Sequence, residues 1–335
     1  MTTVNAYAVL DPKGPLVPFQ YELGPLSASE IDIRVESCGI CHSDLSMIDN
    51  EWGMSSYPVV PGHEVVGTVA AIGSNVTNLV VGQRVGLGWF SSSCMHCRQC
   101  LGGDHNLCSS AEATIVGRFG GFADFVRCNS AWVAALPSGV DADSAGPLFC
   151  GGITVFNPIV QFGVKPTHKV GVIGIGGLGH LALQFLNKWG CEVTAFSSSL
   201  KKADEARSLG AHHVVNSRDS DSMQALAGRF DFILNTTNVT LDWAAYFNAL
   251  APRGRLHTVG AVIEPIAASA FSLIMGQRSL SGSPVGSPAT VDDMLQFCAR
   301  HKISPMTEYF PMSEINTALD HLRSGAARYR VVVKN

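Results

Sequence analysis

Four cysteines fall within fifteen residues of one another, at Cys94, Cys97, Cys100 and Cys108. The segment between them is polar and rich in glycine, so it has little apolar surface to bury and needs a bound ion to fold. Thiolates at this spacing are typical of one tetrahedral metal ion. We expect a structural zinc ion, because four sulfurs leave no coordination position open. A four-cysteine iron–sulfur cluster is the chemical alternative.

Two thiols, one imidazole and one carboxylate elsewhere in the chain form a second candidate metal site. They are Cys41, His63, Glu64 and Cys150, of which His63 and Glu64 are adjacent. Taken one at a time, such residues are more often a core thiol, a turn histidine or a solvated acid. Taken together, they match the ligand set of a catalytic zinc ion that keeps room for water.

A glycine-rich segment provides a candidate site for a dinucleotide. It reads Gly174-Ile175-Gly176-Gly177-Leu178-Gly179, after a β-branched run at 169–173 and at the start of a helical pattern. Glycines in this context let backbone N–H groups approach a pyrophosphate at the helix N-terminus. The segment therefore predicts dinucleotide binding, and the alternative is a glycine-rich turn without a ligand. We expect Thr154 to be a further cofactor-binding residue.

The segment after the next predicted strand indicates which dinucleotide is bound. A chain that binds NAD usually carries an acid there for the ribose 2′-hydroxyl. This chain has Ser197, Ser198, Ser199 and Lys202 instead, with no acid before Asp204. Hydroxyls and an ammonium group suit a 2′-phosphate, so we expect NADP(H). The serines could equally cap a helix whose lysines face solvent.

Short apolar or alternating runs separated by glycines dominate the first 135 residues. Examples are residues 5–9, 31–35, 65–69, 82–85, 122–126 and 132–137. Many short strands with glycine between them are typical of a barrel-like antiparallel fold.

After about Gly151 the pattern changes to alternating strands and helices. Strands are predicted at 169–173, 193–196, 214–215, 230–234, 256–259 and 280–282, with helical patterns such as 201–209 and 241–250 between them. This alternation predicts a doubly wound parallel sheet. We therefore predict an α/β chain with a Rossmann dinucleotide-binding domain at 151–283. A discontinuous, β-rich catalytic domain comprises 1–150 and 284–335.

The composition limits the possible partners. The chain has 335 residues, 46% hydrophobic and 15% charged, with a net charge of −4. There is no run of like charges for nucleic acid or an anionic membrane. No apolar stretch approaches the roughly 18 residues of a membrane span. The sequence also lacks a signal-peptide pattern. We expect a cytoplasmic protein, whose ten cysteines serve as ligands or core residues rather than in disulfides.

Three motifs occur together in one order along the chain. They are Gly-His-Glu-x2-Gly at 62–67, the four-cysteine segment, and Gly-x-Gly-Gly-x-Gly at 174–179. In this combination the chain resembles the zinc-dependent medium-chain alcohol dehydrogenases, over about residues 31–280. Cys-His-Ser-Asp-Leu at 41–45 and the serines at 197–199 resemble the cinnamyl alcohol dehydrogenase-like branch. The resemblance implies that the β-rich domain is GroES-like.

The resemblance also assigns roles in the second candidate site. It implies that the catalytic zinc ligands are Cys41, His63 and Cys150, with Glu64 as a fourth ligand that exchanges with water. Asp44 is implied to orient His63, although it could be an ordinary acid of a helix N-terminus. Ser43 is implied to bind the substrate oxygen and take its proton.

The route by which this proton leaves departs from the family pattern. Many relatives carry a histidine three residues after the serine, and this chain has Ser46 there. The proton could leave through the cofactor ribose and water, or through His42.

Together with the serine segment at 197–199, the resemblance implies two zinc ions and NADP(H) per chain, and hydride transfer between primary alcohols and aldehydes. Trp52, Trp89 and Phe90 could line a pocket for aromatic or medium-chain aliphatic substrates, or they could belong to the core. Two alternatives are a polyol dehydrogenase of the same superfamily and a non-catalytic NADPH-binding zinc protein. We expect a homodimer, because the last Rossmann strand, near residues 280–283, could pair with its copy.

Overall fold

The computed structural model describes residues 2–335 and contains two compact units. The first unit comprises the chain up to Ile153 together with Val285–Asn335, and the second comprises Thr154–Pro284. The chain therefore enters the second unit once and then returns to the first. Within residues 2–335 no helix is both long enough and apolar enough to span a membrane.

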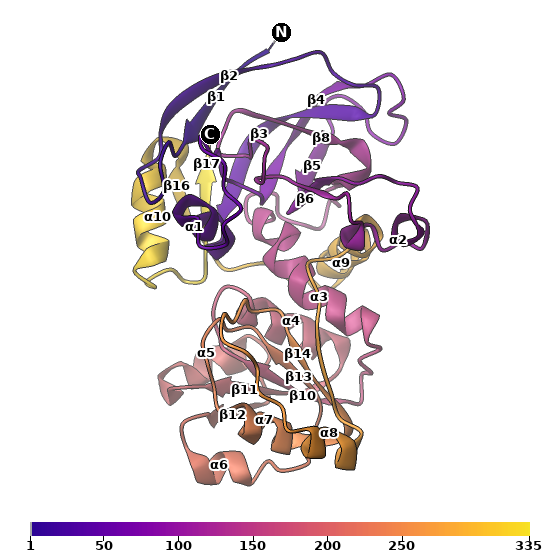
Figure 1. Cartoon of the computed structure of the whole chain (residues 1–335), viewed down its shortest axis with the longest axis vertical. Helices are drawn as coiled ribbons and strands as arrows, with labels where there is room; N and C mark the ends of the chain where they lie inside the picture. Colours follow the sequence, from indigo (N-terminus) through magenta and orange to yellow (C-terminus); the bar gives the residue numbers. More distant parts are fainter. Residues whose placement is uncertain (1) are drawn as a thin grey trace. The chain divides into compact units, whose positions relative to one another are not determined.

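A β-sheet with the strand order β16-β17-β3-β4-β5-β9 dominates the first unit, and β8 also pairs with β3. Its strands are β3 (Glu30–Ile40), β4 (Val65–Ile72), β5 (Arg84–Leu87), β8 (Phe125–Asn129), β9 (Val133–Ala135), β16 (Thr307–Pro311) and β17 (Arg330–Lys334). The pairs are antiparallel except β16–β17, which is parallel. In Figure 1 the yellow C-terminal strand β17 lies beside β3, so both ends of the sequence build this sheet.

Two small antiparallel pairs and short helices complete the first unit. The pairs join β1 (Thr2–Ala8) with β2 (Val17–Leu23) and β6 (Phe90–Ser92) with β7 (Glu112–Ala113). The helices are α1 (His42–Asp49), α2 (Arg98–Leu101), α9 (Pro288–His301) and α10 (Ile315–Arg323), with 3-10 turns at His105–Leu107, Ser130–Trp132, Gly146–Phe149 and Met312–Glu314. Side chains from strands far apart in sequence, among them Ile33, Val85 and Val331, share one apolar core.

The second unit is a parallel sheet with the order β12-β11-β10-β13-β14-β15. Its strands are β10 (Lys169–Ile173), β11 (Glu192–Ser197), β12 (His213–Asn216), β13 (Phe230–Asn235), β14 (Leu250–Thr258) and β15 (Ser279–Gly282). The order reverses between β10 and β13, which is the doubly wound arrangement. The predicted α/β fold class, with a Rossmann sheet and a separate β-rich unit, is confirmed.

Helices connect the parallel strands of this sheet. They are α4 (Gly179–Trp189), α5 (Ala203–Ser208), α6 (Ser220–Gln224), α7 (Trp243–Ala249) and α8 (Ala270–Gly276), with a 3-10 turn at Leu200–Lys202. Helix α3 (Gly151–Gln161) precedes the first strand, β10. Phe196 of β11 and Phe230 of β13 pack with Tyr246 of α7 in the core beneath these helices. This packing fixes the strands whose carboxyl ends carry the glycine-rich turn and the serines.

Candidate functional site

Cys41, His63, Glu64 and Cys150 converge in the first unit. One ligand atom from each lies within 4.8 Å of the others, and all four residues are buried. Cys41 is the N-cap of α1, where β3 ends, and Cys150 follows the 3-10 turn Gly146–Phe149. Three separate parts of the chain thus supply the donors, and β3 and β4 hold two of them at neighbouring strand ends.

Asp44 organises this cluster from the first turn of α1. Its Oδ2 accepts a hydrogen bond from Cys41 N at 2.8 Å, and its Oδ1 accepts from Gly62 N at 2.9 Å. Oδ1 also lies 2.9 Å from His63 Nδ1, so the protonated Nδ1 of the ring donates to it. The carboxylate therefore leaves His63 Nε2 free to bind a metal.

The ligand atoms influence one another electrostatically. His63 Nε2 lies 3.3 Å and Cys41 Sγ 3.8 Å from Cys150 Sγ. The hydrogen bond from Cys150 lowers the pKa of Cys41 well below its usual value against the opposing effect of burial. Burial opposes protonation of His63, but the Asp44 carboxylate raises its pKa well above the usual value.

Arg330, which the sequence analysis did not single out, pairs with Glu64. Its Nη2 donates to Glu64 Oε1, and the two side chains are 6% and 0% exposed. Burial raises the pKa of Glu64 to about 7, although the Arg330 charge opposes this. The sequence signal that could have identified Arg330 is its position: it is a cation at the start of a strand whose next three residues are apolar.

The donor set fits a zinc ion. Sulfur atoms about 2.3 Å from one tetrahedral zinc ion lie about 3.8 Å apart, and Cys41 Sγ and Cys150 Sγ are separated by 3.8 Å. Among the described residues Glu64 Oε2 is a buried oxygen without a hydrogen-bond partner. A buried carboxylate oxygen that lacks a donor is suited to a cation.

The second cysteine cluster also converges. The sulfurs of Cys94, Cys97, Cys100 and Cys108 lie within 4.8 Å of one another, around α2 and the 3-10 turn that follows it. Cys94 Sγ is 3.6 Å from Cys108 Sγ and 4.0 Å from Cys100 Sγ. These separations fit one tetrahedral ion. In a cluster of several irons the sulfurs bind different metal atoms, so this spacing favours a single ion over the cluster.

Backbone N–H groups support negative charge on these sulfurs. Cys97 N donates to Cys94 Sγ at 3.3 Å, and Ser110 N donates to Cys108 Sγ at 3.4 Å. Backbone hydrogen bonds from His96 and Cys97 lower the pKa of Cys94 to about 6. A thiolate is the form that binds a metal, so these hydrogen bonds favour the protonation state of Cys94 that an ion requires.

The glycine-rich turn joins β10 to α4 and forms an open cradle. Gly174 has φ +86°, and a Cβ on Gly179 would lie 1.9 Å from Gly174 O, so both positions require glycine. Thr236 Oγ1, at the end of neighbouring β13, donates to Ile173 O at 2.8 Å. Within the described chain, residues 176–178 donate to no backbone carbonyl. The residues therefore fit a pyrophosphate.

The other expected cofactor residues lie at separate places. Ser197 ends β11, and Ser199 Oγ accepts from Lys201 N at 3.2 Å, which caps the 3-10 turn as the helix-cap alternative expected. Ser198 and Lys202 are exposed, whereas Thr154 is buried in α3. The cap uses Ser199 only, so the Ser198 side chain stays directed to the surface.

Ser43, the expected proton-relay residue, lies beside the metal-ligand cluster. It is half-buried, with its Oγ 3.8 Å from Cys41 Sγ. Ser46, one turn later on α1, is buried and donates from Oγ to Glu51 Oε2 at 2.7 Å. Glu51 and His42 are exposed. The pairing of Ser46 with an exposed carboxylate was not anticipated from the sequence.

Of the three aromatic side chains considered for the substrate pocket, Trp89 lies next to the cluster and Trp52 lies next to Trp89. The Trp89 ring is 5.0 Å from the His63 ring and 6.0 Å from the Trp52 ring, both edge-on. Trp52 is 37% exposed. Phe90 packs against Trp132 at 5.3 Å and belongs to the interior.

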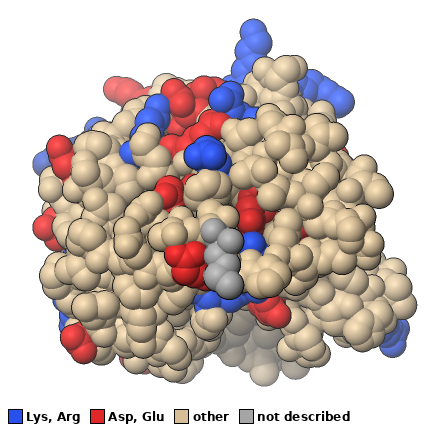
Figure 2. Space-filling view, turned by 90° about the horizontal axis from the view of Figure 1, so that it is seen from above, with Lys and Arg blue, Asp and Glu red and all other residues tan. Residues whose placement is uncertain are grey.

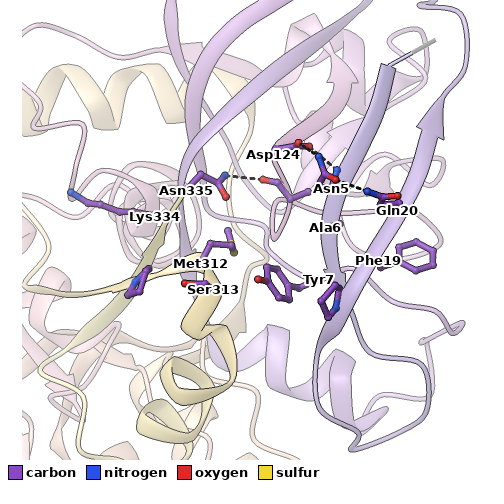
Figure 3. A pocket seen from close by; sticks show the side chains of 13 residues that line it. Asn5, Ala6, Tyr7, Phe19, Gln20, Asp124, Met312, Ser313, Lys334 and Asn335 are labelled. Carbon is purple, nitrogen blue, oxygen red and sulfur yellow. Dashed lines mark hydrogen bonds between the residues drawn. The ribbon is translucent and has the colours of Figure 1, made fainter.

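A separate cavity of about 650 Å³ lies between the β1–β2 hairpin and the C-terminal strand (Figure 3). The polar side chains around it bond to one another. Asn5 Nδ2 donates to Asp124 Oδ2 at 2.7 Å, and Gln20 Nε2 donates to Asn5 Oδ1 at 2.8 Å. Asn335 Nδ2 donates to Ala123 O at 3.0 Å. None of the proposed metal or cofactor residues lines this cavity.

Charged side chains of both signs are interspersed on the face of the molecule in Figure 2. Lys and Arg lie among Asp, Glu and many uncharged residues there. The described residues of this face therefore form no continuous basic surface of the kind that binds nucleic acid.

Two family models match the chain in succession. The alcohol dehydrogenase GroES-like domain matches residues 27–138, and the zinc-binding dehydrogenase model matches residues 177–300. Aldehyde reductase AdhA of Synechocystis sp. is 57% identical over 332 residues, which cover 99% of both chains.

Solved structures agree with these matches. A cinnamyl alcohol dehydrogenase from Sorghum bicolor superimposes with a TM-score of 0.95 at 36% identity, covering 99% of this chain and 98% of that one. A CAD from Helicobacter pylori, complexed with NADP(H), superimposes with a TM-score of 0.90 at 27% identity and the same coverage. The chain belongs to the zinc-binding medium-chain alcohol dehydrogenases, in their cinnamyl alcohol dehydrogenase-like branch.

Proposed function

We propose that this alcohol dehydrogenase is zinc- and NADP(H)-dependent and interconverts primary alcohols and aldehydes that are aromatic or medium-chain aliphatic. The observation that carries the proposal is the convergence of four buried donor atoms, from Cys41, His63, Glu64 and Cys150, within 4.8 Å of one another. The relatives named aldehyde reductase and cinnamyl alcohol dehydrogenase support the reaction class.

The cluster residues divide the chemical work. A bound zinc ion supplies Lewis-acid chemistry that acidifies an alcohol or polarises a carbonyl. Ser43, beside Cys41, hydrogen-bonds the substrate oxygen and exchanges its proton. Asp44 fixes the tautomer of His63. Glu64 keeps one oxygen on Arg330, and its other oxygen is buried without a hydrogen-bond partner, so it can bind or withdraw without losing its ion pair.

The proton leaves through Ser46 and Glu51. Ser43 and Ser46 are three residues apart on α1, so they lie on the same helix face. Ser46 Oγ already donates to Glu51, whose carboxylate is exposed and can pass a proton to water. This pair replaces the histidine that many relatives carry. His42, also exposed, is the competing exit.

The cofactor sites support NADP(H) in the second unit. The turn at 174–179 offers free backbone donors for the pyrophosphate, and Ser197, Ser198, Ser199 and Lys202 present donors without an acid at the end of β11. The Helicobacter pylori structure, which holds NADP(H), supports the same choice. In this proposal Thr154 is a further cofactor contact.

The substrate class rests on two aromatic side chains. Trp89 lies against the His63 ring, and Trp52 lies edge-on to Trp89. Flat apolar surfaces next to a metal ligand suit an aromatic ring or an alkyl chain. A polyol dehydrogenase is the second candidate, because a probable mannitol dehydrogenase of Fragaria ananassa is 38% identical over 98% of this chain.

A panel of aldehydes, alcohols and polyols, assayed with NADPH and NADH, tests these proposals. We expect aldehyde-dependent loss of NADPH absorbance and a lower KM for NADPH than for NADH. Cys41→Ser and Cys150→Ser should abolish turnover and leave NADPH binding intact, while Cys298→Ser, at a buried cysteine outside both clusters, should retain activity. Turnover of polyols alone would favour the second candidate. Zinc-loaded protein that binds NADPH but turns over nothing would indicate a non-catalytic protein.

Two zinc ions, a homodimer and a cytoplasmic location complete the proposal. The four-cysteine segment provides the second, structural zinc site.

The dimer would use an edge of the second unit. Strand β15 is an edge strand, and exposed Phe271, Ile274 and Met275 of α8 form an apolar surface that a second copy would cover. All ten cysteines are free thiols, which suits a reducing compartment.

A further inference from the structure

Arg218 is a cation without a partner at the carboxyl end of β12. Within residues 2–335 its guanidinium forms no hydrogen bond or ion pair, and the side chain is exposed. Two other arginines of the second unit are engaged, since Arg207 binds Asp204 and Arg229 binds Glu192. The Nε of Arg278 is buried without a hydrogen-bond partner. An unpaired guanidinium has all five of its N–H donors available to bind an anion.

The strand register brings Arg218 close to the serine segment at the end of β11. Residues Ser197 and Asn216 are partners in the β11–β12 pair, and Ser217 N donates to Ser197 O at 2.9 Å. Asn216 Oδ1 in turn accepts from Arg218 N at 3.1 Å and fixes the turn. Figure 1 shows β11 and β12 as neighbours at one side of this sheet.

A cavity of about 1160 Å³ opens between these two strand ends and α7. Ser198, Ser217 and Arg218 line it together, and Arg278 is a second arginine in its lining. Asp242 also lines it, but its Oδ1 accepts from Ala245 N as the cap of α7. Asp219, next to Arg218, accepts from Ser222 Oγ at 2.5 Å. Neither acid is paired with the guanidinium.

In a doubly wound sheet the adenosine ribose binds at the end of the second strand, which here is β11. A 2′-phosphate at that ribose carries up to two negative charges, and a guanidinium recognises it with paired hydrogen bonds. We propose that Arg218, from the third strand, binds the 2′-phosphate together with Ser198 and is a specificity-determining residue for NADP(H). The inference rests on the proposed NADP(H) preference and adds a residue from outside the serine–lysine segment.

Binding of nucleotide fragments to the full-length, zinc-loaded protein tests this role without turnover. Calorimetry with 2′,5′-ADP and with 5′-AMP compares ligands that differ only in the 2′-phosphate. We expect the unmodified protein to bind 2′,5′-ADP more tightly. Arg218→Gln should lower the affinity for 2′,5′-ADP about tenfold and change the affinity for 5′-AMP less than twofold. The affinity of Arg218→Lys for 2′,5′-ADP should lie between those of Arg218→Gln and the unmodified protein. Arg207→Gln, at an exposed arginine already paired with Asp204, is the matched control and should change neither.

Kinetics provide the second readout. Arg218→Gln should raise the KM for NADPH about tenfold and leave kcat and the KM for NADH unchanged. The role of Arg218 is overturned, while the NADP(H) preference stands, if the Arg218→Gln variant binds 2′,5′-ADP as tightly as the unmodified protein does. The same holds if its affinities for 2′,5′-ADP and 5′-AMP fall by equal factors. An unmodified protein that binds both nucleotides equally overturns the NADP(H) preference itself, and this inference with it.

Discussion

His63 Nδ1 donates to Asp44 Oδ1 over 2.9 Å, and neither side chain is exposed to solvent. The same carboxylate accepts the backbone N–H groups of Gly62 and Cys41. One acid thus fixes the ring orientation of a ligand and the backbone of the two segments that carry ligands. Metal affinity should therefore depend on Asp44 although it is not itself a ligand.

Asp44→Asn should lower zinc affinity and kcat/KM about 10- to 100-fold, the usual cost of losing the carboxylate behind a ligating histidine. Metal analysis after dialysis against a graded chelator measures the affinity. Asp49→Asn, on the same helix but paired with Arg323, should bind zinc normally. Zinc binding by Asp44→Asn equal to the unmodified protein would contradict the role assigned to Asp44.

Arg330→Met should destabilise the first unit by about 3–5 kcal/mol, because the buried Glu64 carboxyl loses its partner and must either stay an unpaired charge or take up a proton. Urea unfolding of the metal-free protein measures the loss. The double variant Glu64→Gln with Arg330→Met removes both charges and should recover part of the stability. Equal stability of Arg330→Met and the unmodified protein would show that the pair contributes nothing.

Cys97→Ser should reduce the zinc content from the two ions we propose to one per chain, because a structural site with three sulfurs loses affinity. The segment around α2 should then be cut by proteases, since the ion supplies its folding energy. Metal analysis and limited proteolysis report the two effects. Cys191→Ser, at a buried cysteine outside both clusters, should keep two ions and resist cleavage.

Ile274→Asp should convert the proposed dimer to a monomer, because it places a charge in the apolar surface of α8 and next to edge strand β15. Light scattering during size-exclusion chromatography gives the mass. Leu101→Asp, at a side chain 77% exposed on α2, is the control and should leave the mass unchanged. A monomeric mass for the unmodified protein would rule out the dimer.

Glu51→Gln should lower kcat for alcohol oxidation at least tenfold, because the amide cannot take the proton from Ser46. High concentrations of a small buffer base should restore the rate, which a structural defect would not allow. His42→Ala should retain the unmodified rate. If His42→Ala is slow and Glu51→Gln is not, the proton leaves through His42 instead.

Sites built from residues close in sequence were predictable. The four cysteines at 94–108 converge, and the turn at 174–179 joins a strand to a helix, as their spacing and context predicted, because a few bonds limit how far such residues separate. The ion and the pyrophosphate that they would bind stay predictions. The strands β10, β11 and β13 were predicted near their observed positions because buried parallel strands are continuous apolar runs. Strand β14 begins at Leu250, well before the predicted start at 256, because its first half contains Pro252, Arg253 and Gly254. Strand β2 was missed, since its alternation contains Pro18 and its apolar residues are only half-buried.

The sequence by itself determined the ligand types, the glycine turn, the absence of an acid after β11 and the α/β fold class, because each depends on composition or on short-range geometry. Only the tertiary structure decided that Arg330 pairs with Glu64, that Ser46 donates to Glu51 and that Arg218 lies beside Ser198. Glu64 and Arg330 are 266 positions apart. Their contact follows from the pairing of β17 with β3 and of β3 with β4, and strand order is a property of the whole sheet.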